Sequence, residues 1–364
     1  MEGLKTPLYD MHLSLGGNMV SFGGYLLPTY YNGINHEHSV VRSKVGLFDV
    51  SHMGEFIISG TDAQNFLQKM TINDVGLLNV GQVQYSAMCY DDGGILDDLL
   101  LYKDEEKFMM VVNANNIEKN KEWLNKNLDG HVKLKDISNQ MGLLAIQGPR
   151  SRDVLQTLTD INLSSIEYYH FINGKIAGID SIISRTGYTG ELGYELYVNS
   201  DVVLDIWDKL LDAGSYYGIE PVGLGCRDTL RIEMKYPLYG NDIDETTNPL
   251  ESGLGWITKI NKESFIGKNA IIDLKRKIQR RLICIEMNDR SIPRNGCLIY
   301  KYDELVGIIT SGTMSPSLEK GIGIGYVKIP HTEAGTNLEI DIRGKIKGST
   351  VIKPPFYKKG SLMD

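Results

Sequence analysis

The stretch VQYSAMCYDDGGILDDLLLYKDEEKFMMVVN, residues 83–113, decides the fold. It holds three runs rich in β-branched and aromatic residues, at 83–90, 95–102 and 107–113, separated by short turns that contain Gly, Asp and Lys. Such runs predict β-strands, and connections this short favour hairpins over the crossovers that parallel strands need. A similar run lies at 55–59. The sequence therefore predicts an antiparallel sheet rather than a doubly wound parallel one.

Two adjacent carboxylates, Asp97 and Asp98, lie inside the second of these strands. Successive side chains of a strand point to opposite faces of the sheet, and the neighbours of both residues are apolar. At least one carboxylate is therefore expected to be partly removed from water. The pair could cap a turn or protect an edge strand from pairing, or one member could be catalytic.

Helical patterns interrupt these strands. The segment 61–70 begins with residues typical of helix caps, and 115–128 places its apolar residues roughly on one face. A third helix is expected over 200–214, with Ser200 as its cap and Gly214 as its stop.

The pattern changes near residue 280. A basic helix is expected over 262–281, and after it come short strands with Gly-rich turns. This segment of about 80 residues is typical of a β-barrel or β-sandwich module. We therefore predict an α+β, antiparallel-sheet-rich protein with one region at 1–280 and a C-terminal β-barrel domain at 281–364.

The composition of the chain argues against several classes of function. A chain of 364 residues is long enough for two or three domains, and its net charge of −8 argues against nucleic acid or an acidic membrane surface as a partner. No apolar run is long enough to cross a membrane, and no signal peptide is visible. The four cysteines show no zinc or disulfide spacing, so we expect no metal and a reducing, cytoplasmic location; they are Cys89, Cys226, Cys284 and Cys297.

Three further segments could carry chemistry. The stretch RTGYTGELGYELYV, 185–198, fits either a hairpin that needs Gly in its turn or a loop brought close to a flat ligand. In GLGCRDTLRIEM, Arg227 and Arg231 are one helical turn apart, which is typical of a solvated ion-pair face. A cation so near a helix start is unfavourable by the helix dipole, which gives Arg227 some weight as a ligand contact. The lone His52 is interpreted as a structural histidine.

An ordered set of motifs spans nearly the whole chain and resembles one family. The chain is similar to the aminomethyltransferases of the glycine cleavage system, the T-proteins. The motifs are TPLYDMH, VGLFDVSHMGE, GGILDDLL, VVNANNIEKN, AIQGP, SRTGYTGELGYEL, GLGCRDTLRIEMKYPLYGNDIDETTNPLESGLGW, FIGK, GIITSGTMSPSLEKGIGIGYV and KPPFY.

The resemblance implies a three-part, cloverleaf-like fold around a central opening, with two parts interleaved in the first 280 residues. It also implies a transferase reaction. The H-protein delivers an aminomethyl group on its lipoyl arm, and the enzyme transfers the methylene to tetrahydrofolate, the co-substrate. Ammonia and methylenetetrahydrofolate are the products. The glycine-decarboxylating P-protein and the dihydrolipoyl dehydrogenase L-protein are implied as functional partners in glycine catabolism and one-carbon metabolism.

The resemblance also implies a catalytic residue. The second Asp of the family's pair is the catalytic one, which corresponds to Asp98. A carboxylate near the folate nitrogens can steer a proton during attack on the methylene carbon. It can also stabilise the iminium-like cation that forms as ammonia leaves. Asp97 is then expected to be structural.

The same comparison implies folate-binding residues. Glu195 corresponds to the carboxylate that accepts hydrogen bonds from the pterin edge, an arrangement of the charge-assisted kind. Tyr85 and Tyr188 correspond to tyrosines of the pocket, and Arg227 to a folate-contacting arginine. Asn113, at the end of the strand after the Asp pair, is a further candidate.

The sequence departs from the family at its end, where Lys358 and Lys359 are the only cations of the tail, so no ligand contact is carried over to it. The basic run 275–281 is one candidate docking patch for the H-protein, although a solvated face is the simpler interpretation.

Three alternatives remain. The folate domains of sarcosine or dimethylglycine oxidation come fused to a flavin domain, for which this chain has no room. A non-catalytic folate-binding relative linked to iron–sulfur assembly carries a KGCYxGQE-type motif, which is absent here. A β-rich binding module without chemistry is the third.

Overall fold

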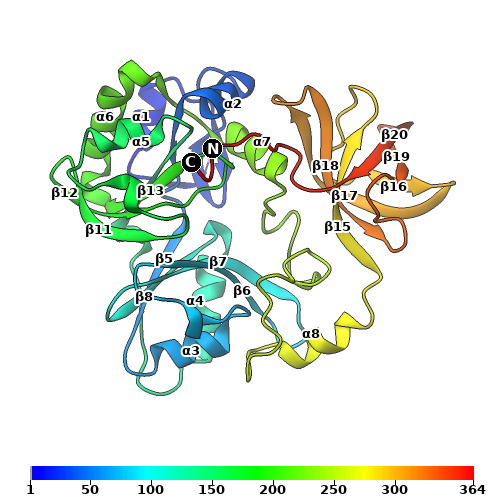
Figure 1. Cartoon of the computed structure of the whole chain (residues 1–364), viewed down its shortest axis with the longest axis horizontal. Helices are drawn as coiled ribbons and strands as arrows, with labels where there is room; N and C mark the ends of the chain where they lie inside the picture. Colours follow the sequence, from blue (N-terminus) through cyan, green and yellow to red (C-terminus); the bar gives the residue numbers. More distant parts are fainter. Residues whose placement is uncertain (1) are drawn as a thin grey trace.

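The computed structural model describes residues 2–364 and has three lobes (Figure 1). Two lobes are built on open sheets, and the third is a closed six-stranded barrel. Most strand pairs are antiparallel, as predicted. The expected α+β, sheet-rich architecture with three parts is confirmed, and the C-terminal module is a barrel rather than a sandwich.

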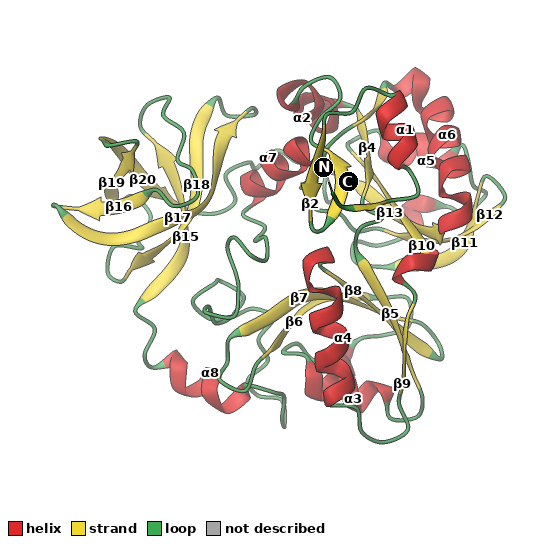
Figure 2. Cartoon of the chain, turned by 180° about the vertical axis from the view of Figure 1, so that it is seen from behind, coloured by secondary structure: helices red, strands yellow, loops and turns green. Residues whose placement is uncertain are grey.

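The first lobe contains a six-stranded sheet in the order β11-β12-β13-β10-β4-β14. Its strands are β4 (Val45–Asp49), β10 (Met141–Gln147), β11 (Phe171–Ile176), β12 (Ile179–Ser184), β13 (Gly193–Asn199) and β14 (Ile219–Pro221). Its outer face is covered by helices (Figure 2), which are α1 (Tyr9–Ser14), α5 (Ser151–Gln156) and α6 (Val203–Gly214). A small sheet precedes it, made of β1 (Leu4–Lys5), β2 (Met19–Phe22) and β3 (Tyr25–Pro28).

The second lobe contains a five-stranded sheet in the order β6-β7-β8-β5-β9. Its strands are β5 (Gly54–Ser59), β6 (Val83–Cys89), β7 (Ile95–Lys103), β8 (Lys107–Val112) and β9 (Lys133–Asp136). The four predicted strands of this sheet agree with the structure to within one residue at each end. Helices α3 (Ala63–Met70) and α4 (Ile117–Lys126) pack on one face of the sheet through a shared apolar core.

The chain passes from β4 into the second lobe and returns at β10, which pairs with β4. Two chain crossings therefore connect the two open sheets. The sheet faces turned away from α1, α5 and α6 and from α3 and α4 pack against each other. The core between them includes Phe48, Tyr102, Val111 and Leu143. Sheet-on-sheet packing of this kind fixes the relative position of the two lobes.

The third lobe is made of strands and loops (Figure 2). Its strands are β15 (Arg280–Met287), β16 (Leu298–Lys301), β17 (Glu304–Ser315), β18 (Lys320–Lys328), β19 (Asn337–Ile342) and β20 (Lys345–Ile352). The barrel closes in the order β15-β18-β17-β16-β19-β20 around its own apolar core. The domain boundary near residue 280 stays a prediction.

Two helix predictions are wrong in detail. The basic helix over 262–281 is only α8 (Lys268–Lys275), because the chain turns there and Arg280 already pairs with β18. The candidate docking patch at 275–281 is therefore not a helical face. Ser200 is not a cap, since the side chain of Asn199 caps the turn that precedes α6.

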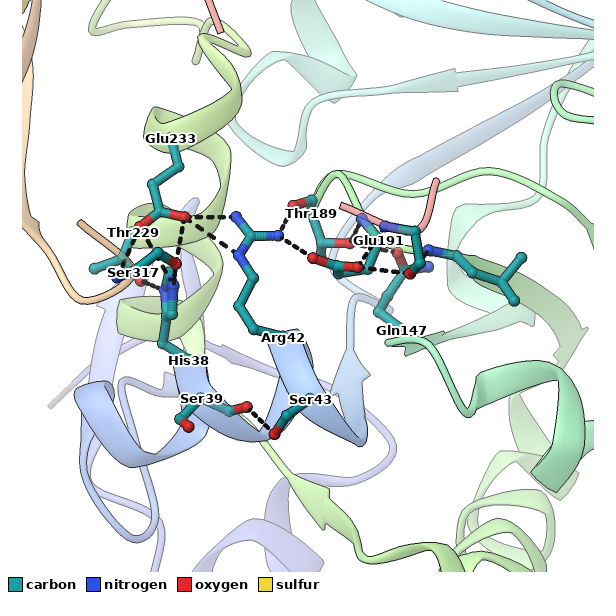
Figure 3. Close-up of polar contacts among 12 residues, drawn as sticks. His38, Ser39, Arg42, Ser43, Gln147, Thr189, Glu191, Thr229, Glu233 and Ser317 are labelled. Carbon is teal, nitrogen blue, oxygen red and sulfur yellow. Dashed lines mark hydrogen bonds and ion pairs between the residues drawn. The ribbon is translucent and has the colours of Figure 1, made fainter. Parts of the chain in front are cut away.

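Helix α7 (Leu224–Met234) lies between the first lobe and the barrel (Figure 1), and its buried Glu233 joins both. Arg42, on α2 (Ile34–Ser43), donates to Oε2 of Glu233 from Nη2 at 2.7 Å and also pairs with Glu191 (Figure 3). From the barrel, Ser315 donates to Oε1 at 2.5 Å and Ser317 to Oε2 at 2.9 Å. One carboxylate thus accepts hydrogen bonds from two lobes.

His38 completes this cluster (Figure 3). Its Nδ1 lies 2.8 Å from Thr229 Oγ1, and its Nε2 lies 2.8 Å from Ser317 Oγ. Both hydroxyls already donate elsewhere, Thr229 to the carbonyl of Cys226 and Ser317 to Glu233. The two contacts of the ring nitrogens hold the imidazole beside Glu233, whose Oε1 lies 3.4 Å from Nε2.

The C-terminal tail returns from the barrel to the first lobe, so both chain ends lie near α7 (Figure 1). The backbone N–H groups of Phe356 and Tyr357 donate to the carbonyl of Glu233 at 2.9 and 3.1 Å. Further along, Ser361 donates to Glu191 from its backbone and its hydroxyl. The tail therefore connects the barrel back to the first lobe.

We predict that Glu233→Gln lowers the free energy of unfolding by about 2–4 kcal/mol, because it leaves the buried charge of Arg42 poorly compensated. Urea denaturation measures the effect. Glu286→Gln is the matched control, since Glu286 pairs with Lys320 at the surface. This variant should lower the free energy of unfolding by less than about 1 kcal/mol. Equal losses in the two variants would contradict the role of Glu233.

The pH dependence of stability gives a second readout. Burial alone raises the pKa of Glu233, but contacts with His38 and Arg42 outweigh it and lower the pKa to about 2. The stabilisation is therefore complete above the unfolded-state value of about 4.3 and is lost as the pH falls towards 2. In Glu233→Gln, this part of the acid sensitivity should be absent.

Candidate active site

A cavity of about 850 Å³ lies where the lobes meet, within the size range of small-molecule sites. Its walls come from both open sheets, from the end of α7, from the loop that follows and from the start of the C-terminal tail. The structure brings all six predicted site residues into this wall: Tyr85, Asp98, Asn113, Tyr188, Glu195 and Arg227.

Asp97 and Asp98 point to opposite sides of β7, as the strand alternation predicts. Asp98 lines the cavity. Asp97 is fully buried towards α4 and accepts hydrogen bonds from the side-chain amides of Asn116 at 2.7 Å and Asn120 at 2.6 Å. Asp97 thus has protein donors on its side of the sheet, whereas Asp98 faces space that can hold a ligand.

Asn113 bridges the two carboxylates. Its side-chain Nδ2 donates to Oδ1 of Asp97 and Oδ1 of Asp98, both at 2.8 Å. Tyr85 donates to the other oxygen of Asp98 at 2.9 Å. Burial raises the pKa of Asp98 above its ordinary value, while the hydrogen bonds from Tyr85 and Asn113 oppose that rise. Asp98 can therefore bind and release a proton at a pH closer to neutral than an ordinary aspartate can.

Glu195 lies on β13 in the wall from the first lobe and is 9% exposed. Thr186 donates a short hydrogen bond to its Oε2, and the Oε1 atom keeps its lone pairs for a ligand. Burial raises the pKa of Glu195, and Thr186 and the charge of Arg227 partly offset this.

Arg227 lies in the first turn of α7 and places its guanidinium 4.6 Å from the ring centroid of Tyr188. That ring is oriented by its hydroxyl, which donates to the carbonyl of Pro237. The interpretation of this helix face as solvated is wrong, because Arg231 is 2% exposed and pairs with Asp242 at 2.7 Å. Arg227 therefore lines the cavity, and Arg231 stabilises the contact between α7 and the barrel.

The glycines of segment 185–198 have a role that the sequence did not indicate. A Cβ on Gly187 would lie 2.1 Å from Oε1 of Gln147, and one on Gly193 would lie 2.4 Å from its Cδ. Gln147 holds the loop by donating to the carbonyl of Thr186. It also accepts from the hydroxyl of Thr189, and Figure 3 shows these two side chains. These two glycines make room for a buried glutamine, while Gly187 also lines the cavity.

His52 is buried, as expected of a structural histidine, but it is not fully paired. Its Nδ1 has no hydrogen-bond partner among residues 2–364. Burial lowers the pKa of His52 to about 4, with the nearby charge of Arg227 acting in the same direction. The imidazole is therefore neutral near neutral pH and packs against Phe22.

Sequence reasoning missed several residues of the wall. Trp256 stacks on Tyr85 with a centroid distance of 6.2 Å, and it remains 65% exposed at the cavity. Its only signal was its place in the motif GLGW. Lys235 and Tyr236 lie in the same motif but were not singled out, and Tyr168 and Tyr169 had no signal.

Within residues 2–364, no group of three or more His, Cys, Asp or Glu side chains is placed to hold a metal ion. The four cysteines are free thiols. None of the helices in this range is long and apolar enough to cross a membrane.

Comparison with known proteins now places the chain. Residues 8–262 match the family described as the GCVT N-terminal domain, and residues 280–358 match the glycine cleavage T-protein C-terminal barrel domain. Aminomethyltransferases from Halothermothrix orenii and Chloroherpeton thalassium are 47% and 48% identical, over 97% of this chain and 99% of each relative.

The solved structure of the glycine cleavage system aminomethyltransferase T from Bartonella henselae has a TM-score of 0.92 and 31% identity, covering 98% of both chains. The fold is thus that of a transferase built from two interlocked sheets and a barrel. The chain belongs to the glycine cleavage T-protein family and is an aminomethyltransferase enzyme.

We predict that Asn120→Leu lowers the free energy of unfolding by about 1–3 kcal/mol, because it removes a donor from the fully buried carboxylate of Asp97. Asn125→Leu, an exposed position on the same helix, is the matched control and should be close to neutral. Denaturant unfolding of both variants measures the difference. If the two variants are equally stable, Asp97 does not depend on this donor.

Proposed function

We propose that the cavity binds tetrahydrofolate and that the enzyme transfers the methylene of an aminomethyl group to it from the lipoyl arm of the H-protein. The observation that carries the proposal is the arrangement of the two carboxylates. Asp98 and Glu195 lie in walls from different lobes of one cavity. Glu195 accepts from Thr186 on Oε2 alone, and each oxygen of Asp98 accepts one protein hydrogen bond and keeps a second lone pair. The family membership supports the same reaction.

Glu195 suits the edge of a pterin ring. Such an edge offers an amino group and a ring N–H side by side, and a carboxylate that is fixed on one oxygen can accept from both. Tyr188 and Arg227 form a flat, cationic surface beside it, which suits a planar heterocycle. The apolar residues that line the cavity exclude water around these groups.

Asp98 suits the proton transfer. In the overall reaction, the aminomethyl carbon leaves the lipoyl sulfur and becomes bonded to two folate nitrogens. The amino nitrogen departs as ammonia, and the sulfur becomes a thiol. Two N–H protons must therefore be moved, and a carboxylate close to those nitrogens can accept and return one. The same negative charge favours the cationic carbon centre that forms as ammonia leaves.

The partners and setting remain part of the proposal. The lipoylated H-protein is the donor, and the P-protein and L-protein act in the same system, which we place in the cytoplasm. A lipoyl arm requires an entrance to the cavity, and the exposed Trp256 indicates that this wall is open to solvent.

We predict that Asp98→Asn reduces turnover by at least about 100-fold, the usual scale for loss of a positioned acid or base. The assay follows ammonia and methylenetetrahydrofolate with aminomethyl-loaded H-protein and tetrahydrofolate. The variant should fold, because an asparagine can still accept the hydrogen bond from Tyr85. Asp91→Asn, an exposed aspartate in the preceding turn, is the control.

The assay also separates the alternatives. Tight folate binding without ammonia release by the unaltered protein would indicate a non-catalytic folate-binding relative. Full activity of Asp98→Asn would remove Asp98 from the mechanism and leave the acidic pair a structural role.

Tyr85→Phe tests the charge of Asp98. The hydroxyl of Tyr85 lowers the pKa of Asp98, so its removal should raise that pKa and make the ionised form scarcer at low pH. We predict that the acid limb of the kcat/KM profile moves to higher pH in the variant. A limb that stays in place or moves to lower pH would contradict the assignment of that limb to Asp98.

A further inference from the structure

Two cationic side chains line the cavity, Arg227 and Lys235. They occupy different parts of the wall. Arg227 lies over Tyr188, next to the wall that carries Glu195. Lys235 lies at the far end of α7, where the wall is formed by the loop after the helix, by the barrel and by the start of the tail.

The ammonium of Lys235 is placed by Gly253. A Cβ added to Gly253 would lie 2.9 Å from Nζ of Lys235, so the amine rests directly against this glycine, which also lines the cavity. The cavity wall also includes Leu282 of the barrel and Pro354 and Pro355 of the tail. No protein acceptor or carboxylate pairs with the amine of Lys235 within residues 2–364.

The backbone at Lys235 is strained for a lysine. Its φ of 59° and ψ of 34° lie in the left-handed region, where glycine is the residue without a steric cost. A lysine here needs a compensating reason. A cation at a helix C-terminus gains from the helix dipole, which is the purely structural explanation.

The charges of the cavity give a second explanation. The two carboxylates that line it already have partners on one side, Asp98 with Tyr85 and Asn113, and Glu195 with Thr186. The charge of Arg227 acts on Glu195. Lys235 is left as a cation without an anion in a largely apolar hollow, where water screens charges poorly. Such a site attracts a negatively charged ligand group.

We propose that Lys235 forms an anion subsite on the barrel side of the cavity, and that this subsite binds a carboxylate at the end of the ligand remote from the ring held at Glu195. The inference rests on the proposed function, because a reduced folate carries its ring at one end and a glutamyl carboxylate at the other. It adds a determinant of substrate choice, since a ring without a carboxylate tail gains nothing from Lys235.

The test compares two ligands by titration calorimetry, tetrahydrofolate and 6-methyltetrahydropterin, which lacks the p-aminobenzoylglutamate part. Lys235→Gln should weaken tetrahydrofolate binding by about 5–10-fold, the scale of one partly exposed charge-assisted contact, and leave the pterin unchanged. Lys235→Arg should retain tetrahydrofolate binding. Lys345→Gln, exposed on the barrel, is the control and should bind both ligands normally.

Lys235→Gly separates ligand binding from helix capping. If Lys235 serves the ligand, this variant should bind tetrahydrofolate as weakly as Lys235→Gln and unfold at a temperature no lower than the unaltered protein, because the backbone strain is relieved. If Lys235 serves only the helix dipole, the unfolding temperature should fall and the affinity should not change, which would overturn the proposal.

Two further outcomes are decisive. Equal weakening of tetrahydrofolate and the pterin in Lys235→Gln would mean that Lys235 shapes the ring site, and would overturn the carboxylate subsite while leaving folate binding intact. If the unaltered protein binds neither ligand, the proposed function fails, and the subsite fails with it.

Discussion

The structure depends on one buried carboxylate. Glu233 accepts hydrogen bonds from α2, from the barrel and, through its backbone carbonyl, from the returning tail. Removing two or more charges from water is costly, and only near-complete hydrogen bonding offsets that cost. The cluster of Glu233, Arg42, His38 and Glu191 meets this condition. It therefore defines a single position of the barrel relative to the first lobe rather than a range of positions.

Helix α7 converts this constraint into a binding site. Its first turn brings Arg227 to the ring of Tyr188, its middle pairs Arg231 with Asp242 at the barrel junction, and its end carries Glu233 and Lys235. Residues about four apart share one side of a helix. The residues of α7 that bind the barrel therefore lie beside the residues that line the cavity. A rigid contact between α7 and the barrel keeps the cavity residues of these two lobes in fixed positions, which a preorganised site requires.

The strands around the cavity could be predicted from the sequence because their information is local. The alternation in β7 was enough to separate Asp97 from Asp98, and short turns were enough to indicate hairpins. The site residues themselves came from the family resemblance, not from local physics. Long-range packing determined what could not be predicted. Arg231 had the pattern of a solvated ion pair and is buried, and Lys235 lay in a family motif with nothing local to mark it as a residue of the cavity wall.

Long-range contacts also explain the two wrong helix predictions. The basic run after α8 has helix-forming residues, but strand pairing at Arg280 ends the helix, since tertiary contacts outweigh propensity. For the glycines of the loop before β13, the sequence left a hairpin turn and a close approach to a ligand open, and it did not indicate that Gly187 and Gly193 make room for Gln147. In each case the deciding partner lies far away in the sequence.

The returning tail has a consequence for how the protein is made. Pro354 and Pro355 belong to the cavity wall, and Phe356, Tyr357 and Ser361 seal the barrel lobe to the first lobe. Chains are synthesised from the N-terminus, and folding begins on the ribosome. The open sheets can therefore form early, but the cavity is completed only after residues 354–361 leave the exit tunnel. A chain that stops before residue 354 would contain both open sheets and the barrel strands and yet lack a finished site.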